Sequence, residues 1–378
     1  MRTLLLIVCT ALAALGCRAQ NPDATVVYRN GDNGYACFRI PALIRAADGT
    51  LLAFAEARRD GTADRGDIDL VVRRSADNGR TWGEMAVLWD DAGNTCGNPA
   101  PVVVRETGRI VLVACWNRGP DHERDIETGK AGNTRRVFSF YSDDNGLTWS
   151  DPVEITSTVK RPGWTWYATG PCHAIQKAKA PHKGRLVVPA NHKWVTPEGT
   201  IASNSHLLYS DDRGATWQIG AVSQPGGNES TVVELSNGDL MLNMRHYDRA
   251  DSLRLCAVSR DGGVTWDRTW EETQLIEPRC QGSILNYTPY GGKPSRTLLF
   301  SNPRSLKREN MSIGVSRDNG RTWSRFVTVS KGRAAYSDLV CLPDGSVGIL
   351  YENGDPGGKE QLYRRISFET VSPGRLFD

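Results

Sequence analysis

The chain has 378 residues, of which 39% are hydrophobic and 24% charged, and its formal net charge is +3 at pH 7. This balance of charge favours neither nucleic acid nor a membrane surface as the main partner. The length is large for a single compact core and is typical of a chain built from repeats or from two domains.

Residues 1–20 have the pattern of a secretory signal peptide. An arginine precedes an apolar run over residues 4–15, and small residues follow. The run is too short to span a membrane as a helix. Residues 14–17 (ALGC) resemble a bacterial lipoprotein cleavage box with its leucine one place late, whereas residues 17–19 (CRA) fit ordinary signal cleavage. We therefore expect an exported protein that is periplasmic, anchored to the outer membrane through a lipid on Cys17, or secreted.

Residues 35–44 (YACFRIPALI) place Arg39 within an apolar run that otherwise has the pattern of a buried strand. An arginine keeps its charge at every accessible pH, and burying that charge without a partner is costly. The run therefore predicts a structural ion pair, a side chain that reaches solvent, or an anionic ligand at Arg39.

One eight-residue pattern, Ser-x-Asp-x-Gly-x-Thr-Trp, begins at residues 75, 142, 210, 259 and 316. Its chemistry is that of a turn, because the Asp accepts main-chain hydrogen bonds and the Gly adopts a positive φ. Each interval between these Asp boxes holds short apolar runs, enough for about four strands, which is one propeller blade. With the segments before the first box and after the last, we predict an all-β, six-bladed β-propeller over residues 21–378, with very little helix and no second domain.

Seven cysteines follow the predicted signal peptide, and they show no CxxC spacing. Their odd number leaves at least one thiol unpaired, and their spacing predicts no zinc site. Several lie in apolar strands, so we expect most of them to be small buried side chains.

The motif FRIP at 38–41, followed by repeated Asp boxes, resembles the exo-α-sialidases (neuraminidases) of bacteria and animals, which are six-bladed propellers. The resemblance covers nearly all of residues 21–378. Further motifs occur in the order of that family, namely FAEAR (54–58), DRGDIDL (64–70), NEST (228–231), LNMR (242–245), CQGS (280–283), FSNP (300–303), AYSDL (335–339) and LYE (350–352). The resemblance implies an enzyme that hydrolyses terminal sialic acids from glycoproteins, glycolipids and oligosaccharides.

A sialoside carries a carboxylate directly on its anomeric carbon, and the planar fork of arginine meets a carboxylate with two charge-assisted hydrogen bonds. By resemblance, Arg39, Arg245 and Arg308 match the arginine triad of the family. Glu352 matches the glutamate that holds the first arginine in place. Of the alternatives for Arg39, the resemblance thus favours an anionic ligand, the carboxylate of the substrate.

The resemblance assigns the nucleophile to Tyr336, because the family uses a tyrosine and reacts with retention through a tyrosyl-enzyme intermediate. A carboxylate nucleophile would repel the carboxylate of the substrate, whereas a neutral phenol does not. A phenol needs a base to take its proton. Glu229 matches the glutamate of the family in that role, and Glu234 in the run STVVEL is its rival.

The general acid should be a carboxylate that protonates the leaving oxygen and later activates water. Asp64 matches the position of the family acid, in a loop bounded by glycines, and Asp67 is the alternative. Asp60 and Asp69 lie in the same acidic stretch.

The resemblance also implies contacts around the sugar. Arg58 and Asn98 match residues near its O4 end, and Gln281 resembles a contact to the glycerol chain. WYATGP (166–171) and PANH (189–192) resemble pocket wall. The stretch DHERD (121–125) is predicted to be an acidic loop, and no metal or other cofactor is expected.

We predict an exported, monomeric exo-α-sialidase that acts on sialylated glycans and has no nucleic-acid partner. A trans-sialidase and a catalytically silent propeller that binds glycans or proteins are the alternatives. The complete set of acid, base, nucleophile and arginines argues against a silent propeller, because a binding module has no need of all of them.

Overall fold

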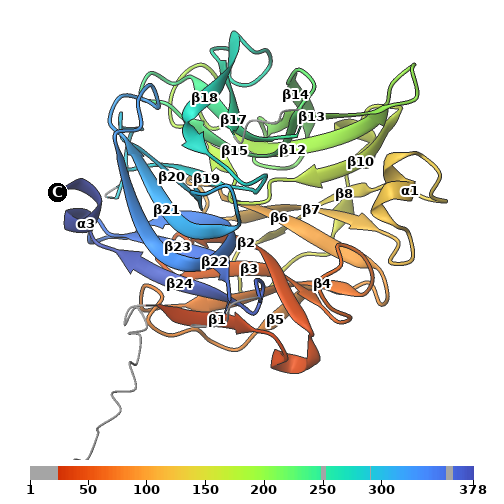
Figure 1. Ribbon diagram of the computed structural model, residues 1–378, viewed down its shortest axis with the longest axis horizontal. Helices are drawn as coiled ribbons and strands as arrows, with labels where there is room; N and C mark the ends of the chain where they lie inside the picture. The colour runs from red at the N-terminus through yellow and green to blue at the C-terminus, as the bar shows by residue number, and fades with distance from the viewer. Residues whose placement is uncertain (1–23, 248–252, 290, 355–360) are drawn as a thin grey trace, which may run out of the picture.

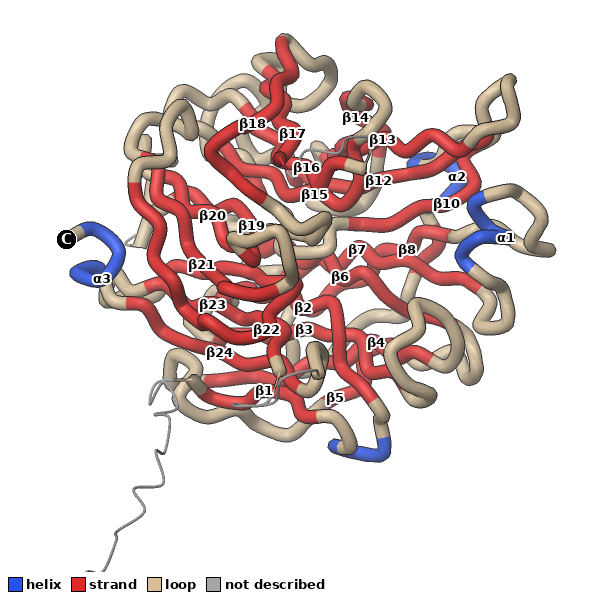
Figure 2. Tube along the Cα trace, in the orientation of Figure 1, coloured by secondary structure: helices blue, strands red, loops and turns tan. Residues whose placement is uncertain are grey.

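The computed structural model describes residues 24–247, 253–289, 291–354 and 361–378. The predicted signal peptide over residues 1–20 lies outside the described residues. Strands dominate the described chain, as Figure 2 shows, and in Figure 1 they are arranged around a common centre.

The strands form six blades, each with an inner strand near the centre and an outer strand at the rim. The first three blades are β2 (Cys37–Arg45), β3 (Leu51–Arg58), β4 (Ile68–Ser75) and β5 (Ala86–Trp89); β6 (Thr95–Val103), β7 (Ile110–Asn117), β8 (Arg136–Ser142) and β9 (Val153–Glu154); and β10 (Trp164–Thr169) with β11 (Ile175–Gln176), β12 (Leu186–Val195), β13 (Ile201–Ser210) and β14 (Gln218–Val222). The fourth blade is β15 (Gly227–Glu234), β16 (Leu240–His246), β17 (Leu253–Ser259) and β18 (Arg268–Ile276).

The last two blades share one long strand. The fifth blade is β19 (Ser283–Asn286), β20 (Leu298–Pro303), β21 (Glu309–Ser316) and the first half of β22 (Arg325–Cys341). The sixth is the second half of β22, β23 (Val347–Asn353), β24 (Arg365–Val371) and β1 (Thr25–Arg29). Because β1 pairs antiparallel with β24, the two ends of the described chain close the ring. The predicted six-bladed propeller is confirmed.

Each blade packs against two neighbours, so both faces of its inner strands are buried. All nine residues of β6 except the last are buried, and every residue of β3 is buried. This is why the strands have the pattern of continuous apolar runs and not of strict alternation. The clusters between blades include aromatic side chains such as Phe38, Phe54 and Phe140.

The five Asp boxes are the turns between the third and fourth strands of the first five blades. In the first box Thr81 N donates to Asp77 Oδ1 (2.9 Å), and Gly79 N donates to Ser75 Oγ (2.8 Å). Gly79 has φ +87°, and a Cβ there would come within 2.1 Å of the Phe368 ring. The sixth blade has no box because its third and fourth strands, β24 and β1, come from opposite ends of the chain, so no turn joins them.

Helical structure in the described chain is limited to η1 (Asp32–Gly34), α1 (Glu123–Glu127), α2 (Thr156–Val159) and α3 (Pro373–Phe377). The prediction of an acidic loop at 121–125 was wrong, because α1 begins within that stretch. Within the described ranges, no helix has both the length and the apolar character that crossing a bilayer requires. The seven described cysteines are all unpaired, and six of them are buried, as expected from their apolar surroundings.

Candidate active site

A cavity of about 160 Å³ opens where the inner strands begin. It is lined by eight of the residues selected from the sequence, namely Arg39, Arg58, Asp64, Asn98, Glu229, Arg245, Arg308 and Tyr336. These side chains come from five blades, either from their strands or from the loops that connect those strands. Six basic and four acidic side chains line the cavity, so its field attracts an anion.

Irregular strand pairing presents these side chains to the cavity. The register shifts within β2 beside Arg39, within β6 at Asn98, within β15 at Glu229 and within β22 at Tyr336. A bulge bends a strand and turns a side chain that regular pairing would point elsewhere. Ile40 adopts φ +60°, which is strained for a β-branched residue, and Asn98 adopts φ +56°. The inner strands are therefore distorted at the residues that line the cavity.

Tyr336, Glu229 and Arg245 form one connected group. The Tyr336 hydroxyl donates to Glu229 Oε1 (2.5 Å), and Arg245 NH1 donates to Glu229 Oε2 (2.7 Å) and to the Tyr336 oxygen (3.2 Å). Burial, together with the Glu229 carboxylate, raises the pKa of Tyr336 well above its ordinary value. The resting phenol therefore keeps its proton, and Glu229 is the group placed to accept it.

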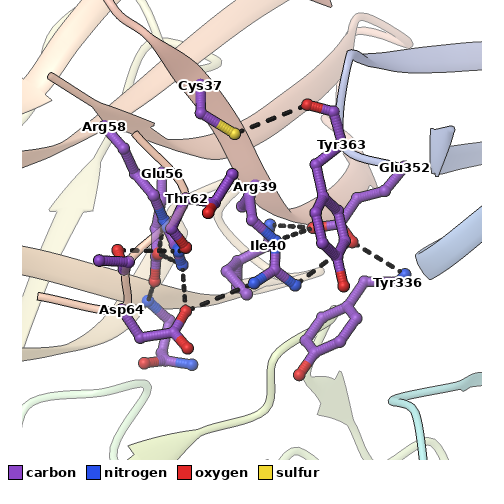
Figure 3. A network of polar contacts seen from close by, with 12 residues as sticks. Cys37, Arg39, Ile40, Glu56, Arg58, Thr62, Asp64, Tyr336, Glu352 and Tyr363 are labelled. Atoms are coloured by element: carbon purple, nitrogen blue, oxygen red, sulfur yellow. Dashed lines mark hydrogen bonds and ion pairs between the residues drawn. The ribbon is translucent and has the colours of Figure 1, made fainter. Parts of the chain in front are cut away.

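Arg39 lies between two carboxylates (Figure 3). Its Nε donates to Glu352 Oε1 (3.2 Å), and its NH1 lies 3.4 Å from Asp64 Oδ1. Burial acts to lower the pKa of Arg39, but Glu352, with smaller contributions from Tyr363 and Asp64, raises it well above the ordinary value. Arg39 therefore has a structural ion pair with Glu352, and its guanidinium is also positioned to bind an anionic ligand in the cavity.

Arg308 also lies beside Tyr336. Its guanidinium lies 5.5 Å from the centre of the Tyr336 ring, and the guanidinium of Arg39 lies 5.1 Å from the same ring. Arg308 donates to the hydroxyl of Tyr363 and to the main-chain oxygen of Arg279 (3.1 Å). Both acceptors are neutral, so no carboxylate is bound to this guanidinium in the described contacts. Arg308 keeps its full charge available to an anion in the cavity.

Asp64 faces the cavity with its side chain 52% exposed. Its Oδ1 lies 2.7 Å from Arg58 NH2, and Arg58 is held in turn by Glu56. Partial removal of Asp64 from water acts to raise its pKa, but the guanidinium groups of Arg58 and Arg39 outweigh this and hold that pKa below its ordinary value. The carboxyl is therefore ionised at neutral pH.

Residues 49–349 match the family of the BNR repeat-like domain. The chain is 31% identical over 378 residues to a sialidase of Paraclostridium sordellii, across 92% of this chain and 90% of that relative. The chain belongs to the sialidase family. A sialidase of Micromonospora viridifaciens is 35% identical over 337 residues, which cover 86% of this chain but only 51% of the relative, so the chain spans about half of its length. The solved Hadza microbial sialidase Hz136 has a TM-score of 0.79 and 29% identity, covering 93% of this chain and 69% of that one.

Glu234 and Asp67, the predicted alternatives to Glu229 and Asp64 in this sialidase, lie outside the cavity. Glu234 is five residues beyond Glu229 on β15, near the other end of the inner strands, where its Oε1 lies 3.1 Å from Lys177 Nζ. Asp67 pairs with Arg59 at 3.3 Å and does not line the cavity. The geometry thus places Glu229 and Asp64 in the cavity and leaves their rivals outside it.

Gln281 requires a correction, because it does not line the sialidase cavity. Its side chain is fully buried, with Nε2 donating to the main-chain oxygens of Pro171 (2.9 Å) and Ser337 (3.0 Å). Its Oε1 accepts from Ser337 N (3.0 Å). These contacts tie Gln281 to the loop after β10 and to β22, so its side chain is not available to a ligand. Glu352 also lies behind the cavity wall, but it contacts Arg39 as the resemblance implied.

Several cavity residues were not identified from the sequence. Glu123 of α1 and Lys193 of β12 line the cavity with an N–O distance of 3.6 Å, and Tyr247 stacks 4.7 Å from the Arg245 guanidinium. Trp166 lies in the stretch expected to form pocket wall, and it does so. Tyr363 is not part of the lining, but its ring lies 4.1 Å from the Arg39 guanidinium, and it was missed because no motif marks it. The charged run at 121–125 was the only signal for Glu123.

Proposed function

We propose that this chain is an exo-α-sialidase that removes terminal sialic acid from glycans with retention of configuration. The observation that carries the proposal is the 2.5 Å contact between Tyr336 and Glu229 in a cavity lined by five arginines, three of which surround Tyr336. A phenol beside a base and facing cations suits attack on a sugar that carries its own carboxylate. We further propose that the enzyme is an exported monomer, with residues 1–20 as its signal peptide and a lipid on Cys17 as the alternative to free secretion.

The arginines bind the substrate carboxylate. Arg39, Arg245 and Arg308 bring three guanidinium groups around the Tyr336 ring, from different blades. Each is kept charged, and together they place the anomeric carbon next to the Tyr336 oxygen. Glu352 and Glu229 hold two of the arginines in the absence of substrate.

The first chemical step forms a bond between the Tyr336 oxygen and the anomeric carbon while the glycosidic bond breaks. The Tyr336 proton passes to Glu229, and a proton from Asp64 passes to the leaving oxygen. In the second step, water attacks the anomeric carbon and gives its proton to Asp64. Glu229 then returns the first proton to Tyr336, and sialic acid leaves with its original configuration.

Substrate binding also prepares Asp64 for its role as acid. Arg39 contacts Asp64 at 3.4 Å, and this contact contributes to the low pKa of the carboxyl. When Arg39 binds the substrate carboxylate, the attraction between Arg39 and Asp64 is offset by the added negative charge. The pKa of Asp64 then rises toward the range in which it donates a proton.

The experiment that tests this function is hydrolysis of an aryl sialoside, with the anomer of the first product followed by NMR. Retention and release of free sialic acid are expected. A 3-fluoro sialosyl fluoride should lose its anomeric fluoride and accumulate as a covalent adduct, and mass spectrometry of peptides should locate it on Tyr336. Absence of turnover would favour a silent binding propeller, and sialyl transfer to added lactose in place of hydrolysis would favour a transferase.

A further inference from the structure

A second cavity, of about 360 Å³, lies at the other end of the inner strands, and we refer to it as the lower cavity. The strand β2 contributes Arg39 to the active site and residues 43–45 to the lower cavity, and β22 contributes Tyr336 to the first and residues 339–341 to the second. At about 3.3 Å per residue, Arg39 and Arg45 are roughly 20 Å apart along the strand. The two cavities share no lining residue, and the lower one has the size of a small-molecule site.

All six blades contribute apolar side chains to the walls of the lower cavity. The apolar lining includes Leu43, Val102, Ala174, Val233, Leu285 and Leu339. Such walls suit an apolar body and offer little to the hydroxyl groups of a sugar. The chemistry of the lower cavity therefore differs from that of the polar active site.

His173 lines the lower cavity, and Asp338 behind the cavity wall binds one of its ring nitrogens. Its Nδ1 lies 2.7 Å from Asp338 Oδ1, and its main-chain N–H donates to Asp338 Oδ2 (2.8 Å). Asp338 is fully buried and also accepts from Leu43 N and Ser283 Oγ, so its position is fixed. Burial acts to lower the pKa of His173, but the Asp338 carboxylate outweighs this and raises that pKa above its ordinary value.

The second ring nitrogen of His173, Nε2, has no hydrogen-bond partner among the described residues, although His173 is only 8% exposed. When the ring is protonated, both ring nitrogens are donors, and Asp338 accepts from only one of them. Nε2 is then a charged donor without a protein partner at the cavity wall, so a ligand that accepts from it would gain a charge-assisted hydrogen bond.

Two arginines add positive charge to the lower cavity. Arg45 lines it, and its Nε is buried with no hydrogen-bond partner. Arg105 donates to the main-chain oxygens of Gln176 (2.8 Å) and Lys177 (2.6 Å), which are neutral. The one carboxylate of the described lining, Glu234, is offset by the Lys177 ammonium at 3.1 Å. The walls of the lower cavity are thus mostly apolar, and the polar groups among them carry a net positive charge.

We propose that the lower cavity binds a small carboxylate with an apolar body, of the size of an arylacetate. Its carboxylate accepts hydrogen bonds from Nε2 of His173 and from the guanidinium of Arg45, and its apolar body contacts Leu43 and Leu339. This site is separate from the sialidase chemistry and does not depend on it.

Phenylacetate is the probe, and the readout is the side-chain ¹⁵N resonance of His173 in the whole protein labelled at histidine. A saturable shift is expected with phenylacetate and not with 2-phenylethanol, which lacks the charge, and acetate should bind at least about tenfold more weakly because it lacks the apolar body. Because phenylacetate could also bind the active-site arginines, the titration is repeated with excess sialic acid. The shift should persist.

Two variants complete the test, with affinity measured by calorimetry in excess sialic acid. His173→Asn keeps a donor for Asp338 but removes Nε2, and Arg45→Met keeps the chain length but removes the charge. Each should weaken phenylacetate binding by about tenfold or more. If His173→Asn does not fold, Arg45→Met alone decides. Equal affinity in the folded variants, equal binding of 2-phenylethanol, or loss of the His173 shift on adding sialic acid would overturn the proposal.

Discussion

The carboxylate of Glu352 faces the guanidinium of Arg39 with both oxygens, at 3.2 Å from Nε and 3.4 Å from NH2. The same carboxylate accepts from the main-chain N–H groups of Ile40 (2.8 Å) and Tyr336 (3.2 Å). Glu352 is fully buried, so it fixes the bulged parts of β2 and β22 as well as the arginine. One side chain thereby positions two inner strands at the active site.

Replacing this carboxylate should therefore be costly to stability. In Glu352→Gln an amide NH2 would face the donors of Arg39, and the buried guanidinium would lose its main negative partner. The free energy of unfolding should fall by about 3 to 5 kcal/mol, measured by urea denaturation. Asp143→Asn, which breaks the exposed pair of Asp143 with Arg109, is the control and should cost about 1 kcal/mol or less. Equal losses in the two variants would contradict the role of Glu352.

Arg308→Ala should weaken substrate binding without a comparable loss of stability. The substrate carboxylate would lose one charged donor, so KM should rise by roughly 30- to 150-fold, which corresponds to about 2 to 3 kcal/mol. Steady-state kinetics with an aryl sialoside measures the change. Arg304→Ala is a matched control, because Arg304 is exposed and stacks 3.9 Å from the Phe326 ring outside the cavity. Normal kinetics in a folded Arg308→Ala protein would remove Arg308 from the site.

The Asp boxes should make stability depend on pH in the acid range. Hydrogen bonds from Thr148 lower the pKa of Asp144 from 3.8 to about 2, and those from Thr81 do the same for Asp77. Because the folded pKa lies below the unfolded one, this stabilisation is complete above about pH 4 and is lost as the pH falls toward 2.

Urea unfolding at a series of pH values between 5 and 2.5 measures this dependence. Asp144→Asn removes one titrating group whose folded pKa is lowered, so it should reduce the slope of unfolding free energy against pH. An unaltered slope in Asp144→Asn would show that the box carboxylate is not the source.

The fold was largely predictable because its signals are local. An Asp box needs only eight neighbouring residues, and a buried strand needs only a short apolar run, so the blades could be counted from the sequence. The strand that closes the sixth blade could not be recognised, because β1 and β24 are joined by pairing between the two ends of the chain. Even the absence of a sixth box follows from that pairing.

The site was predictable in part, for the same reason. Arg39 was noticed because a charge interrupted an apolar run, and the other chemical residues came from motifs. Tyr363 and Lys193 carry no motif, and Lys193 reaches the cavity, and Tyr363 the cavity residue Arg39, only through contacts between distant segments. Gln281 was misplaced because a motif gives the residue but not the direction of its side chain, which here is set by the main chain of Ser337.

The roles of Asp64 and Tyr336 can be separated by the choice of substrate. If Asp64 protonates the leaving group, Asp64→Ala should slow natural sialosides, whose leaving alkoxide is basic, far more than aryl sialosides, whose phenolate leaves unaided. On natural substrates, a loss of roughly 10² to 10⁴ in kcat is expected, in line with the usual contribution of a general acid. Asp67→Ala is the matched control, since Asp67 lies in the same loop but pairs with Arg59 outside the cavity.

Tyr336→Phe should not discriminate between the two substrates, because it removes the covalent step from both. Its ring keeps the shape of the tyrosine, while the hydroxyl 2.5 Å from Glu229 is lost. Any residual hydrolysis should proceed by attack of water on the opposite face, so the first product should change from the retained toward the inverted anomer. Both variants are assayed on both substrates, with the product anomer followed by NMR. Equal losses on aryl and natural substrates would reject Asp64 as the acid, and a Tyr336→Phe protein with full activity and retention would reject Tyr336 as the nucleophile.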